Sequence, residues 1–183
     1  MPKWTFEPGH SAAEFSVRHM MVTWIRGLFP NVHGTLDFDL DHPLDGSLKV
    51  DIDASKIWTG EADRDGHLRA AAFLDVEKHP TITYRGKFVD RIGQNEFKVK
   101  GDLAIKGVTR EVQMDVRYLG QWPTPWWEGG KDLGPKIRAG FVANTVINRH
   151  DFGVSWNGDL ENGGVVVGSD VLIRVDAEAI LDD

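Results

Sequence analysis

Hydrophobic and polar residues alternate along most of this chain. Between Val32 and Leu40 the even positions include Val32, Leu36, Phe38 and Leu40, whereas the odd positions are all polar. A period of two residues predicts a β-strand with one buried face and one face in water. The pattern recurs and predicts eight long strands at residues 11–19, 32–40, 48–53, 81–88, 97–105, 108–118, 137–147 and 171–179, after a short leading strand at 3–7.

Short turns connect most of these strands. Pro43–Gly46 and Gly93–Asn95 have the proline, glycine and asparagine typical of tight turns, and Lys106-Gly107 reverses the chain. Long strands with one apolar face must bury those faces together, and closure into a barrel does so without an open sheet edge. We therefore expect an all-β fold, an extended eight-stranded antiparallel up-and-down β-barrel. No linker or internal repeat interrupts the pattern, so residues 1–183 are expected to form one domain.

Two segments lack the alternation. Glu61–Leu74 is rich in alanine and predicts a short helix between strands, although Gly66 weakens that prediction. Gln121–Pro135 contains three tryptophans among three prolines and three glycines, a composition that predicts a loop. We expect the tryptophans from Trp122 to Trp127 to pack as a lid or against the outer wall; contact with a membrane interface is the alternative.

The predicted buried faces combine large and small residues. Gly34, Gly86, Gly101, Ala139 and Ala143 lie among bulky neighbours. An eight-stranded barrel is close to the size at which side chains either fill the interior or leave room for one ligand. The small residues either leave such room or accommodate strand bends and large neighbours. The residues predicted to line the bore are Phe15, Val17, Leu36, Phe38, Ile82, Tyr84, Leu103, Ile105, Phe141 and Ile147.

Composition narrows the class of protein. The chain has 21 basic and 28 acidic residues and a formal net charge of −7, which argues against a nucleic-acid surface and against strong attraction to anionic lipid. Cysteine is absent, so disulfides and thiol chemistry are excluded. The first residues have no apolar run of signal-peptide length, and no later run approaches a membrane-spanning helix. We therefore expect a cytoplasmic protein with at most transient membrane contact.

The polar residues show no catalytic or metal-binding motif. The seven histidines lack the paired spacing of zinc ligands, and Ser11 beside His10 has no nucleophile-elbow context. We therefore expect no catalytic residue and no metal site. Arg64 is a candidate for binding a polar headgroup, or it ties the helix to the barrel together with Asp65. Likewise, Asn148–Asp151 forms the rim of a pocket or fixes a turn.

Short motifs along the chain resemble those of one family. They include Trp4-Thr5-Phe6, Phe15–His19, Arg64–Leu68, Gly101–Thr109 and Asn148–Gly153. In this order and spacing they resemble the YceI-like family of polyisoprenoid-binding, lipocalin-like proteins over nearly the whole chain. The resemblance implies an extended eight-stranded barrel whose apolar bore holds a long isoprenoid or similar amphiphile, with no catalysis established for the family as a class. The tryptophan-rich segment is not part of the family pattern.

Three hypotheses remain open. The first is a binding protein that carries or sequesters a long-chain isoprenoid lipid, a polyprenyl diphosphate or an isoprenoid quinone, without any other cofactor. Arg64, His67 and Arg149 would then contact the headgroup. The second is an enzyme that acts on such a headgroup, with Arg64 and His150 as candidate residues. The third is a barrel filled by its own side chains that acts as a stress-response or interaction module. A homodimer is possible under each, but nothing in the sequence specifies one.

Overall fold

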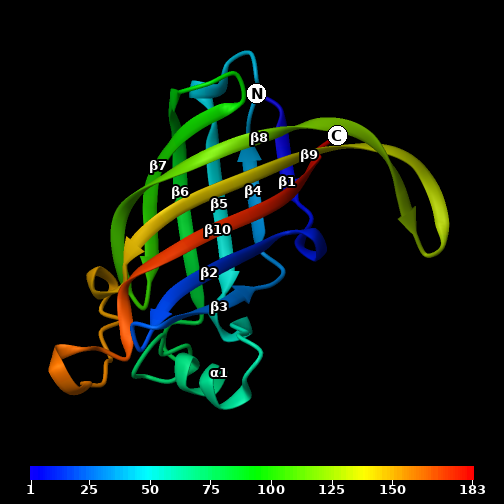
Figure 1. Cartoon of the computed structure of the whole chain (residues 1–183). Helices are drawn as coiled ribbons and strands as arrows, with labels where there is room; N and C mark the ends of the chain where they lie inside the picture. The colour runs from blue at the N-terminus through cyan, green and yellow to red at the C-terminus, as the bar shows by residue number, and fades with distance from the viewer.

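A closed ring of eight antiparallel strands dominates the computed structural model, which describes residues 1–183 (Figure 1). The ring consists of β1 (Lys3–Phe6), β4 (His33–Asp37), β5 (Ser47–Asp53), β6 (Thr81–Arg91), β7 (Glu96–Ile105), β8 (Val108–Glu128), β9 (Lys131–Asn148) and β10 (Val167–Leu181). From β4 to β10 each strand pairs with the next along the chain. The predicted eight-stranded antiparallel barrel is confirmed.

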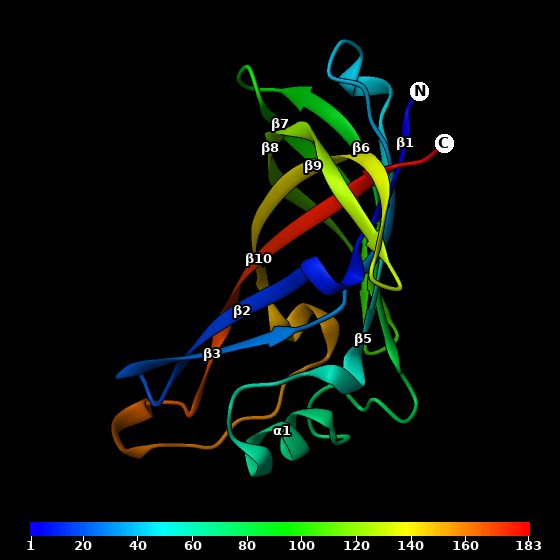
Figure 2. The same ribbon diagram turned by 90° about the vertical axis from the view of Figure 1, so that its right-hand side faces the viewer.

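The N-terminal strands depart from a simple up-and-down order. Trp4 in β1 pairs with Leu36 in β4 on one side and with Leu181 in β10 on the other, so β1 closes the ring. Next to β1 along the same edge of β10 lies β2 (Ala12–His19), and β3 (Thr23–Phe29) pairs with β2. A bridge between Leu28 and Trp58 joins β3 to the segment after β5. At the end of the barrel nearest the helix, β2 and β3 therefore complete the wall (Figure 2).

Strand β3 was not predicted from the sequence, because both of its faces carry apolar residues. Ile25, Gly27 and Phe29 alternate with Trp24 and Leu28, so the period of two is hidden. At Gly27 a Cβ atom would lie 2.5 Å from the ring of Phe15 and 2.8 Å from the methyl group of Thr59, so both side chains pack directly over this glycine. The strand thus forms around the packing of neighbouring rings rather than around a polar outer face.

The helix is shorter than predicted. α1 spans Ala62–Arg69 and begins at Glu61, whose side chain accepts hydrogen bonds from the backbone N–H groups of Asp63 and Arg64. Ala70–Leu74 is not helical, and this part of the prediction is wrong. Here the burial of Phe73 and the partial burial of Leu74 beneath the barrel override the helix propensity of the alanines. Five short 3₁₀ segments lie at Pro8–His10, Pro43–Asp45, Ala54–Lys56, Arg149–Phe152 and Glu161–Gly163. None of the helices is both long and apolar enough to cross a bilayer.

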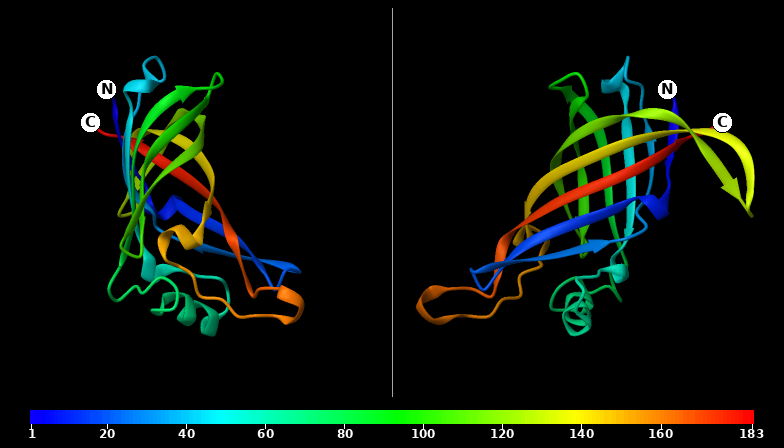
Figure 3. Two further views of the ribbon diagram at one scale, coloured as in Figure 1. Left: turned by 90° about the vertical axis from the view of Figure 1, so that its left-hand side faces the viewer. Right: turned by 45° about the vertical axis from the view of Figure 1, so that its right-hand side comes forward.

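The predicted loop at 121–135 is also wrong, because β8 and β9 continue through it as a two-stranded ribbon. This ribbon, which we call the arm (residues 119–138), extends well beyond the barrel (Figures 1 and 3). It turns at Gly129 and Gly130, both with positive φ. β7 pairs with β8 only as far as Arg117, and β10 pairs with β9 only as far as Arg138. Prolines are tolerated in the arm because its outer edges have no neighbouring strand that needs their missing N–H groups.

Candidate functional site

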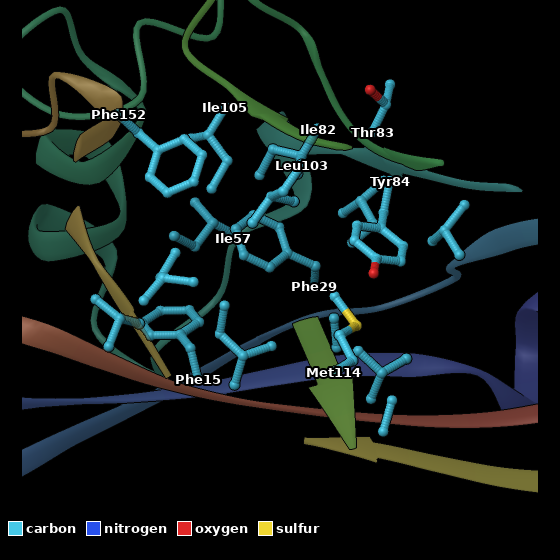
Figure 4. Close-up of a pocket in the computed structure, with 18 of the residues that line it drawn as sticks. Phe15, Phe29, Ile57, Ile82, Thr83, Tyr84, Leu103, Ile105, Met114 and Phe152 are labelled. Carbon is cyan, nitrogen blue, oxygen red and sulfur yellow. The ribbon is translucent and has the colours of Figure 1, made fainter. Parts of the chain in front are cut away.

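The barrel encloses an apolar cavity of about 210 Å³. Of the 32 residues that line it, 30 are hydrophobic, and the others are Thr83 and Arg149. Figure 4 shows Phe15, Phe29, Leu103 and Met114 directed toward a common space, with Phe152 at the end nearest the helix. One ordered water needs roughly 10–15 Å³ and two to four polar partners, so this space is large but offers water almost nothing to bind. It suits an apolar guest.

An aromatic cluster closes the end of the barrel farthest from α1. Phe38 lies 5.3 Å from Phe88, 5.7 Å from Phe97, 5.4 Å from Tyr118 and 5.3 Å from Phe141, measured between ring centroids. All five rings are buried. Tilted and edge-on contacts at these distances are favourable aromatic geometries. A ligand therefore has no route through this end of the barrel without breaking the cluster.

The opposite end is covered by irregular segments instead of packed rings. Leu68 of α1, Phe73 and Leu74 after it, and Phe152 and Val154 after β9 all line the cavity there. Several lining residues at this end, including Phe15, Val17, Leu68, Leu74 and Val171, are only partly buried. Because this end is covered by irregular segments and not by packed rings, we call it the mouth of the cavity.

Three aromatic side chains connect the segments that cover the mouth. The ring of His67 in α1 lies 4.9 Å from that of Phe73 and 4.9 Å from that of Trp156, both edge-on, and Phe73 lies 5.4 Å from Trp156. Nearby, Lys106 Nζ donates a hydrogen bond of 3.0 Å to the carbonyl of Ala71. The cover is therefore held by side-chain contacts between separate segments rather than by a strand ladder.

Most of the predicted bore residues lie around this cavity. Nine of the ten are among its lining residues: Phe15, Val17, Leu36, Ile82, Tyr84, Leu103, Ile105, Phe141 and Ile147. Phe38 is the exception: it lies in the aromatic cluster behind Phe88 and Phe141, which do line the cavity. Sequence reasoning did not select Phe29, Ile57, Phe73 or Phe152, which come from the unpredicted β3 or from segments without alternation.

The small inward residues create this space only in part. A Cβ atom at Gly34 would lie 2.6 Å from the ring of Phe6, and one at Gly86 would lie 2.7 Å from the ring of Tyr84. At Gly101 it would lie 2.3 Å from the carbonyl oxygen of Arg85. These glycines make room for neighbouring rings and backbone, so they accommodate large neighbours and do not leave space for a ligand. Ala143, by contrast, lines the cavity.

Arg149 is the one charged residue that lines the cavity, and it is only 4% exposed. Its guanidinium donates hydrogen bonds to the carbonyls of Val154 (2.7 Å), Trp156 (2.8 Å), Val167 (3.1 Å) and Gly168 (2.7 Å). It forms no salt bridge, and burial lowers the pKa of Arg149 below its ordinary value. An uncompensated cation is thus held at the mouth by backbone oxygens alone.

The other two predicted headgroup residues are occupied differently. Arg64 donates hydrogen bonds to the hydroxyl (2.7 Å) and the carbonyl (3.0 Å) of Thr59, and the buried Asp65 accepts from the Thr59 N–H (2.9 Å) and hydroxyl (2.5 Å). Both side chains thereby attach α1 to the segment that pairs with β3. His67 is exposed and makes the aromatic contacts described above. No hydrogen bond or ring contact joins Arg64, His67 and Arg149 to one another.

The remaining polar candidates have local partners. Ser11 is buried, and its hydroxyl exchanges hydrogen bonds with the backbone of Glu178, whose carboxylate pairs with His10 at 3.1 Å. The Asn148 side chain accepts from the backbone N–H of His150, which is the role of a turn-fixing residue. The Tyr84 hydroxyl lies 3.0 Å from the carbonyl of Val112.

Comparison with known proteins places this architecture in a family. Residues 4–179 match the model of the YceI-like domain. A UPF0312 protein of Staphylococcus epidermidis is 33% identical over 183 residues, covering 100% of both chains. The crystal structure of Burkholderia cenocepacia BcnA shares the fold, with a TM-score of 0.75 at 20% identity over 94% of this chain and 98% of that one. So does a Saccharophagus degradans structure described as a polyisoprenoid binding domain implicated in plant cell wall breakdown, with a TM-score of 0.67 at 15% identity over 98% of each chain. This chain belongs to the YceI-like family.

Proposed function

We propose that the protein binds a long-chain isoprenoid lipid in its cavity and carries or sequesters it, without acting on it as an enzyme. The cavity is the observation that supports this proposal. An empty apolar cavity costs about 24 cal/mol per Å³, so 210 Å³ represents about 5 kcal/mol of lost stability. That is a large fraction of the roughly 5–15 kcal/mol that stabilises a typical domain. A bound apolar chain would recover much of it.

The relatives support the same class of ligand. The family match covers nearly the whole chain, and the Saccharophagus degradans neighbour is described as binding a polyisoprenoid. A polyisoprenoid in a cell already has its tail in a membrane or in another carrier, so transfer into the cavity gains little from the hydrophobic effect. Discrimination between ligands then depends on the shape of the cavity and on the headgroup.

For the headgroup we favour the mouth beside Arg149. The cavity wall has almost no polar surface, so a diphosphate or a quinone ring cannot lie deep inside without losing its hydrogen bonds. Four of the five N–H donors of Arg149 are engaged by carbonyls and no carboxylate neutralises its charge, so an anionic or electron-rich oxygen would be attracted there. Arg64 and His67 lie on α1 at the same end and would make secondary contacts.

Identification of the bound molecule tests the proposal. Native mass spectrometry of freshly purified protein, followed by organic extraction, should yield an apolar prenyl compound. Addition of a polyprenyl diphosphate or an isoprenoid quinone to delipidated protein should raise the unfolding temperature, because a ligand at a hundred times its Kd adds about 2.7 kcal/mol. Protein that is repeatedly empty and unaffected by both lipids would refute the proposal. Turnover of either lipid would support the enzymatic alternative.

A further inference from the structure

The barrel wall is incompletely paired, because β8 and β9 separate as they approach the mouth. Their ladder runs from the turn of the arm to the pair Asp115–Asn144 and ends there. Nearer the mouth, residues 108–114 of β8 pair only with β7, and residues 145–148 of β9 pair only with β10. A groove lies between the two separated strands. We call this groove, between residues 110–113 and 145–148, the seam.

The seam is a polar space that adjoins the apolar cavity. Ile147 and Phe152 line both the seam and the cavity, so the two spaces share a wall. Six of the ten residues around the seam are polar or charged, namely Arg110, Glu111, Gln113, Thr145, Asn148 and Asp151. An amphiphile with its tail in the cavity could therefore place its headgroup in the seam without losing hydrogen bonds.

Two polar side chains interrupt the apolar inward faces of β8 and β9, and both lie at the seam. Arg110 is paired with Leu103 of β7, and Thr145 is paired with Ile173 of β10. Both partners line the cavity. Paired residues of antiparallel strands carry their side chains on the same face of the sheet. Arg110 is nevertheless exposed, because β9 no longer lies alongside it.

Arg110 carries the unpaired positive charge of the seam. Its side chain donates one hydrogen bond of 3.2 Å, to the carbonyl of Thr109, and it forms no salt bridge. The neighbouring Glu111 is already paired with Lys100 at 2.9 Å. Asp151 also lines the seam, but no ion pair joins it to Arg110. Most of the five guanidinium N–H donors are therefore free to bind an anion.

The separated edge of β8 adds backbone donors to the seam. Counted from the two-residue turn at Lys106-Gly107, the alternation of the β7–β8 ladder directs the backbone N–H and C=O groups of Glu111 and Gln113 away from β7. A hydrogen bond of 2.9 Å from Thr145 Oγ1 to the Gln113 carbonyl crosses the seam and agrees with this direction. The N–H groups on this edge have no partner strand, and backbone N–H groups are effective donors to anionic oxygens.

We propose that the seam binds the phosphate headgroup of a prenyl phosphate or diphosphate whose tail lies in the cavity, with Arg110 in direct contact with the phosphate oxygens. This inference rests on the proposed function and adds the position and the charge of the headgroup. Arg149 and Phe152 belong to one 3₁₀ turn, so the seam adjoins the mouth on the side of Arg149. A guanidinium without a carboxylate partner favours a full negative charge over the neutral carbonyl of a quinone.

Arg110→Gln tests the inference when delipidated protein is titrated with a prenyl diphosphate and with the prenyl alcohol of the same chain length. The variant should bind the diphosphate at least about tenfold more weakly and the alcohol within about twofold of the wild type, because only the diphosphate loses a charged contact. Arg110→Lys should recover part of the loss. The matched control is Arg117→Gln, since Arg117 is an exposed arginine of the same strand that pairs with Glu96 on the outward face, and it should change neither affinity. Native mass spectrometry titrations measure each affinity, and unfolding temperatures verify that each variant folds.

Three outcomes would overturn the inference while prenyl binding persists. The first is an Arg110→Gln variant that loses affinity for diphosphate and alcohol equally, or for neither. The second is a wild-type protein that binds an isoprenoid quinone as tightly as the diphosphate, because the seam would then not select for charge. The third is inorganic diphosphate that binds as tightly as the prenyl form, which would make the seam a site for free phosphate compounds. Failure of every prenyl compound to bind is a different result, which would refute the proposed function and this inference with it.

Discussion

Arg149 shows how one side chain can organise a segment that has no regular structure. Its guanidinium binds carbonyls of Val154, Trp156, Val167 and Gly168, which lie on both sides of the irregular stretch before β10. Without these donors, carbonyls in a partly buried place would lack partners, and each such group costs about 1–3 kcal/mol. The apolar wall near the mouth thus depends on a charged residue.

Replacement of Arg149 should therefore be costly even without any ligand. We expect Arg149→Met to lower the free energy of unfolding by about 3 kcal/mol, measured by urea denaturation of delipidated protein. Arg110→Met is the control, because Arg110 is exposed and its one side-chain hydrogen bond goes to the carbonyl of Thr109; its effect should stay within about 0.5 kcal/mol. Equal stability of the two variants would contradict this role of Arg149.

Tyr84 gives the protein a sensitivity to alkali. Burial, together with the charges of Asp102 and Glu111, raises the pKa of Tyr84 above its ordinary value of 10.0, and burial also raises the pKa of Tyr118. The unfolded chain releases the Tyr84 proton from about pH 10 upward while the folded protein retains it, so stability falls as pH rises through that range.

Removal of the hydroxyl should remove this contribution. Tyr84→Phe should cost about 1 kcal/mol at neutral pH, because the hydrogen bond to Val112 is lost. Above about pH 10 the free energy of unfolding of the Tyr84→Phe variant should decline less steeply than that of the wild type. The two slopes should differ by about 1.4 kcal/mol per pH unit. Urea titrations at several alkaline pH values measure both slopes, and parallel slopes would show that Tyr84 ionises equally in both states.

At the scale of elements, strands with one buried face and one solvent-exposed face could be predicted from the sequence. The strands that were missed or misread have other reasons to form. β3 packs rings over Gly27 and has apolar residues on both faces, and the arm carries prolines that only free edges allow. The end of α1 is set by the burial of Phe73 and Leu74 against the core. Local helix propensity cannot predict such a tertiary contact. The bore residues were predictable because alternation alone places them inward, but the contacts of Arg149 join segments that no sequence pattern relates.

The turn between β2 and β3 stores local strain. Met20 and Met21 have φ values of 48° and 61°, a region that costs non-glycine residues roughly 1–2 kcal/mol each. Met20→Asn with Met21→Gly should therefore stabilise the protein by about 1 kcal/mol, as seen by thermal unfolding. The same change at His42 and Pro43, where φ is not positive, should not stabilise it. A neutral or destabilising effect at Met20 and Met21 would show that contacts of these methionines outweigh the strain.

The cover of the mouth should control the rate of ligand exchange. Trp156→Ala removes the aromatic contacts with His67 and Phe73, each worth roughly 0.5–1.5 kcal/mol. Release of a bound prenyl lipid to acceptor vesicles should then become about tenfold faster. The transfer of a fluorescent prenyl analogue to the vesicles measures this rate. Trp122→Ala on the arm should not change that rate. If both variants release lipid at the wild-type rate, exchange does not proceed through this mouth.

For the whole molecule, stability and binding compete for the same space. The aromatic cluster fills one end of the barrel, whereas the other part keeps a cavity that residues as small as Ala143 leave unfilled. Filling it would satisfy the ordinary tendency of protein interiors toward close packing. A sequence selected for stability alone would have larger residues here, so the cavity fits the ligand binding that we propose.

Ala143→Leu tests this competition directly. Burial of the three added carbons should stabilise the delipidated protein by about 2 kcal/mol. The same carbons occupy volume that a prenyl chain needs, so they should weaken its binding about tenfold or more. Ala104→Leu adds the same atoms to β7 at a position that alternates with the inward Leu103 and Ile105, so binding should not change. Should Ala143→Leu overpack and lose stability, Ala13→Val provides a smaller step into the same cavity. Stability and affinity should move in opposite directions for inward substitutions only, because only a ligand inside the barrel shares its space with the core.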